Sequence, residues 1–391
     1  MIAGTSTSPR PTQAPLTADR LNFPTLYFEA TRGCNLRCGI CMTGSNDTQR
    51  VRESKREELS TDEIEALVLK TAKDVGVRVI IWSGGEFLTR KDSLELLRRA
   101  RKHGYRSSVC SNGLKLDRQL LRELKNAGGE DIVLSLGINS LDNDNEGTRD
   151  AEVDVTLRAL DLCEELGVKR HVVVNVGRHN MESLGRTMDW LTEKRIPWNR
   201  SPFTARGSGV KHFTKHAVNR EEMEQYVHPE FRRHFFGYVS YTPLFLAPEV
   251  HDRFSQGQRN RTVPQGPSIG CWCGTWLAVN AEGYVAPCAI LLDVLEAGNV
   301  REGTLGEIVS RSEMFSRILD RNQLQGKCGR CRYQFTCGGC RAMAFFKTGD
   351  YMAEDPTCFF EPQDRNTVCE HEAETNEMFA RYAIMARYAG L

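Results

Sequence analysis

Short apolar segments alternate with segments of helical periodicity between about residues 24 and 204. The expected strands lie at residues 26–33, 77–85, 105–113, 131–139, 170–177 and 198–204, and the expected helices lie at residues 61–76, 94–104, 116–127, 155–167 and 181–195. Strands that alternate with helices of about 10–15 residues pair in parallel through right-handed crossovers. The pattern therefore predicts an α/β fold, either a barrel or a doubly wound sheet, with ligands at the carboxyl ends of the strands.

The alternating pattern ends near residue 205, and segments rich in Gly, His and Pro follow it. Nine of the fourteen cysteines lie from Cys271 onward, so we expect a domain boundary near residues 245–268. The predicted organisation is a flexible leader at residues 1–22, a barrel domain at residues 23–245, a small cysteine-rich α+β domain at residues 246–365 and a helical tail at residues 366–391.

Composition narrows the possible functions. The chain has 391 residues, and its 52 Lys and Arg residues nearly balance 51 Asp and Glu residues, for a net charge of +1. This balance does not favour nucleic acid or an anionic membrane as a partner. No apolar stretch approaches the roughly 20 residues that cross a bilayer, and the N-terminal residues lack the apolar core of a signal peptide. We expect a cytoplasmic protein whose fourteen cysteines serve metal or redox chemistry rather than disulfides.

Three cysteines, Cys34, Cys38 and Cys41, stand directly after the first expected strand. Their C-x3-C-x2-C spacing lets three thiolates converge within one tight loop. A [4Fe–4S] cluster normally takes four thiolates, so a cluster held by three keeps one iron open for a small chelating molecule. The alternative is a zinc loop that a distant Cys or His completes.

The triplet resembles the signature of radical S-adenosylmethionine (SAM) enzymes, and the resemblance extends over the whole alternating region. The segment Trp82-Ser-Gly84-Gly85-Glu86 ends the second expected strand and matches the GGE turn of that family. Two glycines permit close approach of the backbone, and a carboxylate can hold a cationic amino group. The resemblance implies a partial (β/α)6 TIM-like barrel in which Gly84, Gly85 and Glu86 bind the methionyl amino group of SAM.

The same resemblance places contacts to the SAM ribose and carboxylate at the ends of the fourth and fifth strands. The polar residues at these positions are Ser135, Asn139, Asn175 and Arg178. A strand cap is an equally good explanation for each of them. The residue before the third cysteine is commonly aromatic in the family, whereas this chain has Ile40, which retains an apolar group for packing against adenine.

A second set of cysteines follows in the C-terminal part of the chain, around the strand–turn–strand pattern LAVNAEGYVAPC. Its order resembles the SPASM domain that follows the barrel in one branch of the radical SAM family, although zinc ribbons also use C-x2-C pairs. The ligands that the resemblance implies are Cys273, Cys288 and Cys340 for a first auxiliary cluster, with Cys271 as our candidate for its fourth ligand, and Cys328, Cys331, Cys337 and Cys358 for a second. The chain departs from the family in having two residues, Gly338 and Gly339, before Cys340, where three are usual.

Three residues are candidates for catalysis. Cys110 ends the third expected strand, where its thiol could donate or relay a hydrogen atom, although burial as a small apolar residue is the alternative. Arg200 and Arg206 lie in NRSPFTARGSG at the end of the sixth strand and could orient substrate hydroxyls or deprotonate a radical, unless this segment is a solvated loop. Of the remaining cysteines, Cys163 is expected in the core of a helix and Cys369 is unassigned.

The resemblance implies an oxidoreductase with three [4Fe–4S] clusters and SAM as cofactors. Cleavage of SAM yields a 5′-deoxyadenosyl radical, and the protein holds the substrate C–H bond close to it and excludes water. Two auxiliary clusters favour net oxidation because they accept a further electron from the substrate.

Several substrates remain open at this stage. Maturation of a peptide or natural product is the first, oxidation of an aminocyclitol or sugar alcohol in antibiotic biosynthesis is the second, and porphyrin side-chain modification in a haem pathway is the third. A zinc-stabilised binding protein is the alternative outside enzymology. We expect a flavodoxin- or ferredoxin-type electron donor as the protein partner.

Overall fold

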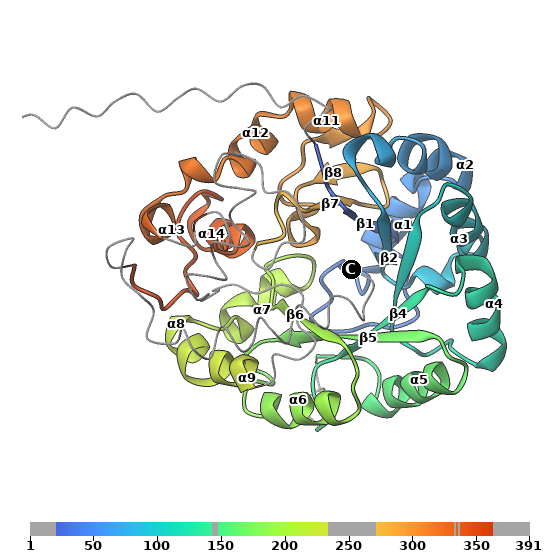
Figure 1. The fold of residues 1–391 in the computed structure, drawn as a ribbon, viewed down its shortest axis with the longest axis horizontal. Helices are drawn as coiled ribbons and strands as arrows, with labels where there is room; N and C mark the ends of the chain where they lie inside the picture. Colours follow the sequence, from blue (N-terminus) through green and yellow to red (C-terminus); the bar gives the residue numbers. More distant parts are fainter. Residues whose placement is uncertain (1–20, 143–147, 234–270, 332–333, 335–336, 363–391) are drawn as a thin grey trace, which may run out of the picture.

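The computed structural model describes residues 21–142, 148–233, 271–331, 334 and 337–362. Its sheet has nine strands in the order β6-β5-β4-β3-β2-β1-β7-β8-β9. The six parallel strands of the first half are β1 (Thr25–Thr31), β2 (Val79–Gly84), β3 (Arg106–Ser111), β4 (Val133–Ile138), β5 (Lys169–Val176) and β6 (Trp198–Pro202). These strands curve into a partial barrel, as the alternating pattern and the family resemblance together predict (Figure 1).

Helices cover the outer face of the six strands (Figure 1). They are α3 (Ser93–Lys102), α4 (Arg118–Gly128), α5 (Val153–Glu165) and α6 (Leu184–Glu193), together with a helical segment that begins with α2 (Thr61–Glu63). That segment continues as a π-helix over Ile64–Leu69 and a 3₁₀ helix over Ala72–Val75. The expected helix at residues 61–76 is therefore present, with an irregular hydrogen-bond pattern.

A helix that the periodicity does not predict, α1 (Thr48–Glu57), follows the first cysteine loop. The Asp47 side chain caps its first turn by accepting from the backbone N–H groups of Gln49 and Arg50. Ser54 is its one buried residue, so α1 lacks the apolar stripe by which a surface helix is recognised in a sequence.

The sheet continues without a break into the cysteine-rich part of the chain. β7 (Trp276–Val279) pairs in parallel with β1, and β8 (Tyr284–Ala286) and β9 (Gly298–Asn299) add antiparallel strands. β7 and β8 form the predicted strand–turn–strand unit. The expected boundary at residues 245–268 and the expected tail at residues 366–391 lie outside the described residues. In the described part, the two predicted domains share one sheet.

The remaining helices flank the two ends of this sheet. After β6 the chain forms α7 (Gly209–His216), α8 (Arg220–Glu222), a π-helical turn (Met223–Val227) and α9 (His228–Arg233). The cysteine-rich part contains α11 (Leu305–Arg311), α12 (Glu313–Leu319), α13 (Gly326–Arg330) and α14 (Arg341–Thr348). No helix among the described residues combines the length and the apolar character that a membrane span needs.

The two faces of β1 have different surroundings. Leu26, Phe28 and Ala30 are buried in the large core that also contains the apolar side chains of the covering helices. Tyr27 and Glu29 alternate with them and point to the opposite, inner face, where Tyr27 meets a small apolar group around Ala278. The inner face is therefore the side of the sheet on which polar chemistry can be built.

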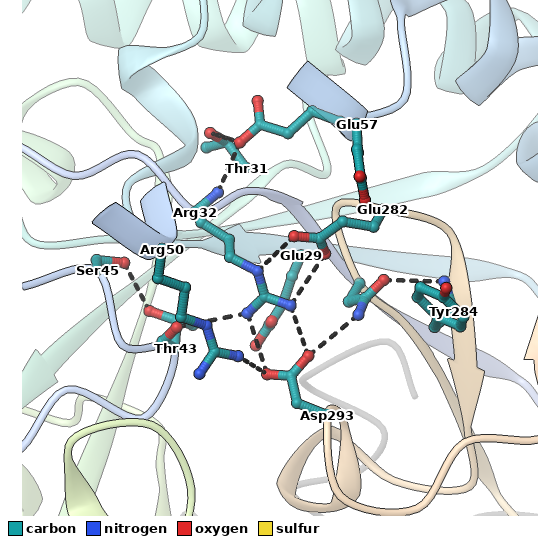
Figure 2. A network of polar contacts seen from close by, with 12 residues as sticks. Glu29, Thr31, Arg32, Thr43, Ser45, Arg50, Glu57, Glu282, Tyr284 and Asp293 are labelled. Atoms are coloured by element: carbon teal, nitrogen blue, oxygen red, sulfur yellow. Dashed lines mark hydrogen bonds and ion pairs between the residues drawn. The ribbon is translucent and has the colours of Figure 1, made fainter. Parts of the chain in front are cut away.

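A buried network of charges joins the barrel to the cysteine-rich part (Figure 2). Arg206 forms ion pairs with Glu29 at 2.6 Å and with Asp293 at 2.8 Å. Arg32, immediately before the first cysteine loop, pairs with Glu282 at 2.6 Å and with Asp293 at 2.5 Å. Both side chains of the Arg206–Glu29 pair are 0% exposed. Pairing of this kind compensates charges that would otherwise be costly to bury.

Arg206 therefore has a different position from the one expected from sequence. We expected a candidate catalytic residue in a polar substrate pocket or in a solvated loop, and the structure shows a buried arginine held by two carboxylates. Its role is to connect β1 with the segment after β6 and with the cysteine-rich part.

Replacement of Arg206 by methionine should lower the free energy of unfolding by about 3–5 kcal/mol, because it leaves the Glu29 carboxylate buried without its partner. Urea unfolding followed by circular dichroism measures this. The matched control is Arg118→Met, which removes a pair with Glu165 whose side chains are 58% and 50% exposed. The control should lose much less, because exposed ion pairs contribute little to stability, and equal losses in the two variants would contradict the prediction.

Candidate functional site

The first cysteine loop begins where β1 ends and is hydrogen-bonded to the GGE turn at the end of β2. The backbone N–H of Gly85 donates to the Thr31 carbonyl at 2.8 Å, and that of Glu86 donates to the Gly33 carbonyl at 2.8 Å. A Cβ atom on Gly84 or Gly85 would overlap these carbonyl-bearing residues, and Gly84 has φ 125°. Both glycines are therefore required for the close approach of the turn to the loop.

Each sulfur atom of the first triplet receives a backbone N–H group. Leu36 donates to Cys34, Asp150 donates to Cys38 and Ser45 donates to Cys41, all at 3.4 Å. Such donors stabilise thiolates, which are the ligands of iron–sulfur clusters. Within the described residues, no three His, Cys, Asp or Glu side chains are arranged to bind a single metal ion. The donor set fits a cluster held by three thiolates.

Glu86 is buried beside this loop and is held by three donors. Its carboxylate accepts from the backbone N–H of Asn112 at 2.7 Å, from that of Leu88 at 3.1 Å and from the Ser111 hydroxyl at 3.2 Å. Burial raises the pKa of Glu86, and these donors oppose the increase. A cationic amino group at this position would compensate the buried carboxylate.

Arg149 is a residue that sequence reasoning missed. It is partly buried, and its guanidinium donates to the Gly137 carbonyl at the end of β4. Burial lowers the pKa of Arg149, whereas the nearby Cys38, Cys34 and Glu86 raise it. The arrangement places a cation beside the first cysteine loop, where it suits a carboxylate ligand. A glycine at position 137 leaves room for the guanidinium, and this was the signal available in the sequence.

Polar side chains form a row across the inner face of the barrel. The Tyr27 hydroxyl lies 2.7 Å from that of Ser83, Cys110 hydrogen-bonds to Ser83 and Ser135, and Ser135 lies 2.8 Å from Nδ1 of His171. Burial raises the pKa of Cys110 to about 11 and lowers the pKa of His171 to about 4. Near pH 7 the row therefore presents a protonated thiol and a neutral imidazole.

The other residues expected to contact SAM differ in the hydrogen bonds that their side chains form. The Asn139 amide donates to the Thr148 hydroxyl at 3.4 Å. The Asn175 side-chain oxygen is buried without a hydrogen-bond partner in the described part of the chain, and it is available to a ligand. Arg178 instead donates to Glu222 at 2.6 Å and to the Thr214 carbonyl at 2.8 Å. The Arg178 guanidinium is thus bound to α7 and α8.

Four cysteines of the C-terminal set surround one cavity. The Cys273 thiol is within hydrogen-bonding distance of Cys271 and Cys288, and Cys340 lies near Cys271 and Cys288. Arg200 from β6 lines the same cavity, where its guanidinium lies 3.6 Å from the Met223 sulfur. The structure thus brings together the four residues that the resemblance and our fourth-ligand candidate assign to one site. It places Arg200 at this site rather than in an open polar loop.

Three other cysteines of the set lie close together, since Cys358 lies near Cys337 and Cys328. Cys331 follows Cys328 by three residues and packs against the large core. The two glycines have φ 72° and 60°, and Cβ atoms there would collide with Arg321 and with the Cys328 sulfur. The double glycine therefore makes the tight turn that brings Cys337 and Cys340 to different sites.

Two buried arginines lie among these cysteines. Arg321 and Arg341 are 4% and 2% exposed, and the nearest sulfur groups include Cys271 for both. Arg341 also donates to the Cys328 sulfur at 3.6 Å. Cations at this depth need anionic neighbours, and thiolates bound to iron supply them. The donor set therefore fits iron–sulfur clusters here as well.

Three aromatic rings join this region to the inner face of the barrel. Trp272, between Cys271 and Cys273, stacks on Trp276 with ring centres 4.2 Å apart and an interplanar angle of 5°. Trp276 in turn stacks on Tyr27 at 6.4 Å and 18°. The rings form a stack that leads from the inner face to the first group of C-terminal cysteines.

Apart from Cys110, two cysteines lie outside these groups. Cys163 is buried in α5, as expected. Cys369 lies outside the described residues.

Sequence relatives of known activity match most of the chain. It is 29% identical over 357 residues to the AdoMet-dependent heme synthase of Methanosarcina barkeri, covering 87% of this chain and 98% of that protein. It is 26% identical over 350 residues to the PqqA peptide cyclase of Granulibacter bethesdensis, covering 86% and 87% of the two chains.

Solved structures share the fold. Streptococcus suis SuiB bound to the precursor peptide SuiA has a TM-score of 0.63 at 18% identity, covering 87% of this chain and 76% of that one. Native anSMEcpe with bound AdoMet has a TM-score of 0.59 at 16% identity, covering 93% and 96%.

Family models agree with both halves of the architecture. Residues 28–191 match the model of the radical SAM superfamily, and residues 271–332 match that of the SPASM iron–sulfur cluster-binding domain. These matches favour iron–sulfur clusters over the alternative of a zinc-stabilised binding protein. With a cysteine loop and GGE turn at the barrel edge and a cysteine-rich region on the same sheet, the chain belongs to the radical SAM superfamily and is an enzyme of its SPASM branch.

Proposed function

We propose that Cys34, Cys38 and Cys41 hold a [4Fe–4S] cluster that binds SAM. The observation that carries this proposal is the fastening of the three-cysteine loop to the Gly84-Gly85 turn, with a backbone N–H group on each sulfur. When bound, the cluster supplies the electron that cleaves SAM into methionine and a 5′-deoxyadenosyl radical.

The residues around the loop bind SAM in this proposal. Glu86 receives the methionyl amino group, and Arg149 receives the methionyl carboxylate in place of Arg178. Asn175, whose side-chain oxygen is buried without a partner, accepts a hydroxyl of the ribose. Ser135 and Asn139 complete the polar surface at the ends of the strands. Opposite charges at the two ends of the methionyl group fix its orientation.

Two auxiliary clusters would complete a net oxidation of the substrate. Cys271, Cys273, Cys288 and Cys340 hold the first, and Cys328, Cys331, Cys337 and Cys358 hold the second. Arg200 lies beside the first group, where it orients a polar substrate group. Cys110, as a protonated thiol on the inner face, is the residue that exchanges a hydrogen atom with a radical.

We assign the substrate to the porphyrins, with side-chain oxidation as the reaction. The M. barkeri heme synthase covers 87% of the chain, and the stack of Tyr27, Trp276 and Trp272 reaches the cavity lined by Trp272, where a further planar aromatic ring system could stack. Arg200 supplies a cation for a carboxylate side chain at this cavity. A peptide is the second candidate, because the PqqA peptide cyclase matches 86% of the chain.

The substrate assignment is tested with the reconstituted enzyme, SAM and a chemical reductant under anaerobic conditions. Iron coproporphyrin III should be converted to a product of altered mass, with about one 5′-deoxyadenosine formed for each hydrogen removed, since each radical abstracts one hydrogen. Conversion of precursor peptides, with no change in the porphyrin, would favour the second candidate instead.

Replacing Cys34, Cys38 and Cys41 together by alanine should lower the iron content from about 12 to about 8 atoms per chain, because one of three four-iron clusters is lost. Formation of 5′-deoxyadenosine should cease. Cys163→Ala, which changes a buried thiol in α5, is the control and should retain both properties. Persistent deoxyadenosine formation in the triple variant would overturn the role of the loop.

Replacing Cys273 and Cys288 by alanine should also remove about four iron atoms per chain. Cleavage of SAM should continue, since the first cysteine loop is unchanged. Iron analysis and chromatography of deoxyadenosine measure the two effects on one sample. Loss of SAM cleavage together with the iron would contradict the separate auxiliary role.

Replacing Arg149 by glutamine should raise the Kd for SAM by about 10- to 100-fold, because a charge-assisted hydrogen bond contributes about 1.5–3 kcal/mol. Equilibrium dialysis with labelled SAM measures the change. Arg178→Gln is the matched control and should bind SAM as the unmodified enzyme does. The reverse pattern would restore Arg178 as the carboxylate ligand.

A further inference from the structure

A basic cavity of ≈ 380 Å³ borders the first cysteine loop. Arg37, Arg52 and Lys55 line it, and none of its lining residues is acidic. The cavity therefore has walls from the cysteine loop, from α1 and from the segment after the GGE turn, and it reaches Cys34 itself.

The three cations of this cavity are not neutralised by neighbouring carboxylates. Arg37, Arg52 and Lys55 are exposed, and the structure gives none of them an ion pair within the described residues. Arg50, on the same helix, shows the contrast, since it is paired with Asp293 at 2.8 Å. In a chain whose net charge is only +1, three unpaired cations around one cavity form a local positive field.

Two carboxylates adjacent to the cavity residues have other partners. Asp150 accepts the backbone N–H of Arg37 at 2.7 Å, and its own backbone N–H donates to the Cys38 sulfur. Glu53, on α1, accepts from the Gln49 side chain at 2.9 Å. Neither forms an ion pair with a cavity cation in the described part of the chain, so the positive charge faces outward.

The position of this charge matters because the cluster loop must receive an electron from outside the protein. The lining residues include Cys34 but none of the inner-face row of Tyr27, Ser83, Cys110, Ser135 and His171. A substrate on the inner face and a partner in this cavity would therefore approach the loop from different sides. Complementary charge accelerates such encounters and orients the partners without a large interface.

We propose that the basic cavity formed by Arg37, Arg52 and Lys55 is the docking surface of an acidic one-electron carrier protein of flavodoxin or ferredoxin type. This inference rests on the proposed function, since it assumes a cluster held by Cys34, Cys38 and Cys41. The reduced carrier loses one electron and the cluster gains it, and no atom or proton is transferred in the step. Docking beside Cys34 keeps the path of the electron short.

The test measures carrier binding and carrier-driven chemistry on the reconstituted enzyme. The variant is Arg37→Glu, Arg52→Glu and Lys55→Glu combined. The matched control reverses three exposed cations outside the cavity, Arg78→Glu, Lys102→Glu and Arg122→Glu. Calorimetry with purified flavodoxin and with ferredoxin gives the Kd at low and at physiological salt, and deoxyadenosine formation is measured with each reduced carrier and with dithionite.

We expect the cavity variant to bind the preferred carrier at least about tenfold more weakly than the control triple, which corresponds to about 1.4 kcal/mol. Binding by the unmodified enzyme should weaken as salt rises, because the interaction is between exposed charges. With dithionite, all three proteins should cleave SAM at similar rates, since a small reductant does not need the docking surface.

Several results would overturn the proposal. Equal carrier affinity in the cavity variant and the control, no dependence on salt, or no binding of either carrier to the unmodified enzyme would each exclude docking at this surface. Failure of dithionite to support SAM cleavage in the unmodified enzyme would instead contradict the proposed function, and the binding measurement would still decide where the carrier docks. If the triple reversal prevents folding, the single variants Arg52→Glu and Lys55→Glu give the same comparison.

Discussion

The Asp293 carboxylate lies at the point where the barrel, the first cysteine loop and the cysteine-rich part meet. Arg32, Arg50 and Arg206 all form ion pairs with it, at 2.5, 2.8 and 2.8 Å. Asp293 has φ 62°, a left-handed conformation that aspartate tolerates better than most residues. These guanidinium groups hold the pKa of Asp293 well below its usual range. A carboxylate with three such partners constrains three parts of the chain at once.

These ion pairs fix the position of the first cysteine loop relative to the cysteine-rich part. Arg32 directly precedes the loop of Cys34, and Asp293 and Glu282 come from the cysteine-rich part. β7 pairs with β1 in the same sheet, so hydrogen bonds and ion pairs act together across this junction. Electron transfer between separate redox sites requires a fixed separation, and a shared sheet with a buried charge network supplies it.

Buried charged side chains also lie around the C-terminal cysteines. Arg321 and Arg341 are nearly inaccessible, and sulfur groups are among their closest charged neighbours. At the first loop the compensation is local and comes from backbone N–H groups and from Arg149. The exposed cations at the cavity beside α1 differ from both, because their charge is left for a partner outside the chain. The chain thus has buried cations beside its C-terminal cysteines and exposed cations at the surface beside its first cysteine loop.

The sequence by itself determined the α/β fold with its parallel strands and covering helices, because strand and helix periodicity are local patterns. The GGE turn was equally visible, since only glycine tolerates the approach of Gly84 and Gly85 to Thr31 and Gly33. Only the tertiary structure decided the roles of the arginines. Arg206 forms a buried ion pair with Glu29, Arg178 forms an ion pair with Glu222, and Arg149 lies beside the cysteine loop. The physical reason is that the function of a long charged side chain depends on the partners it reaches across the fold, and sequence spacing does not encode them.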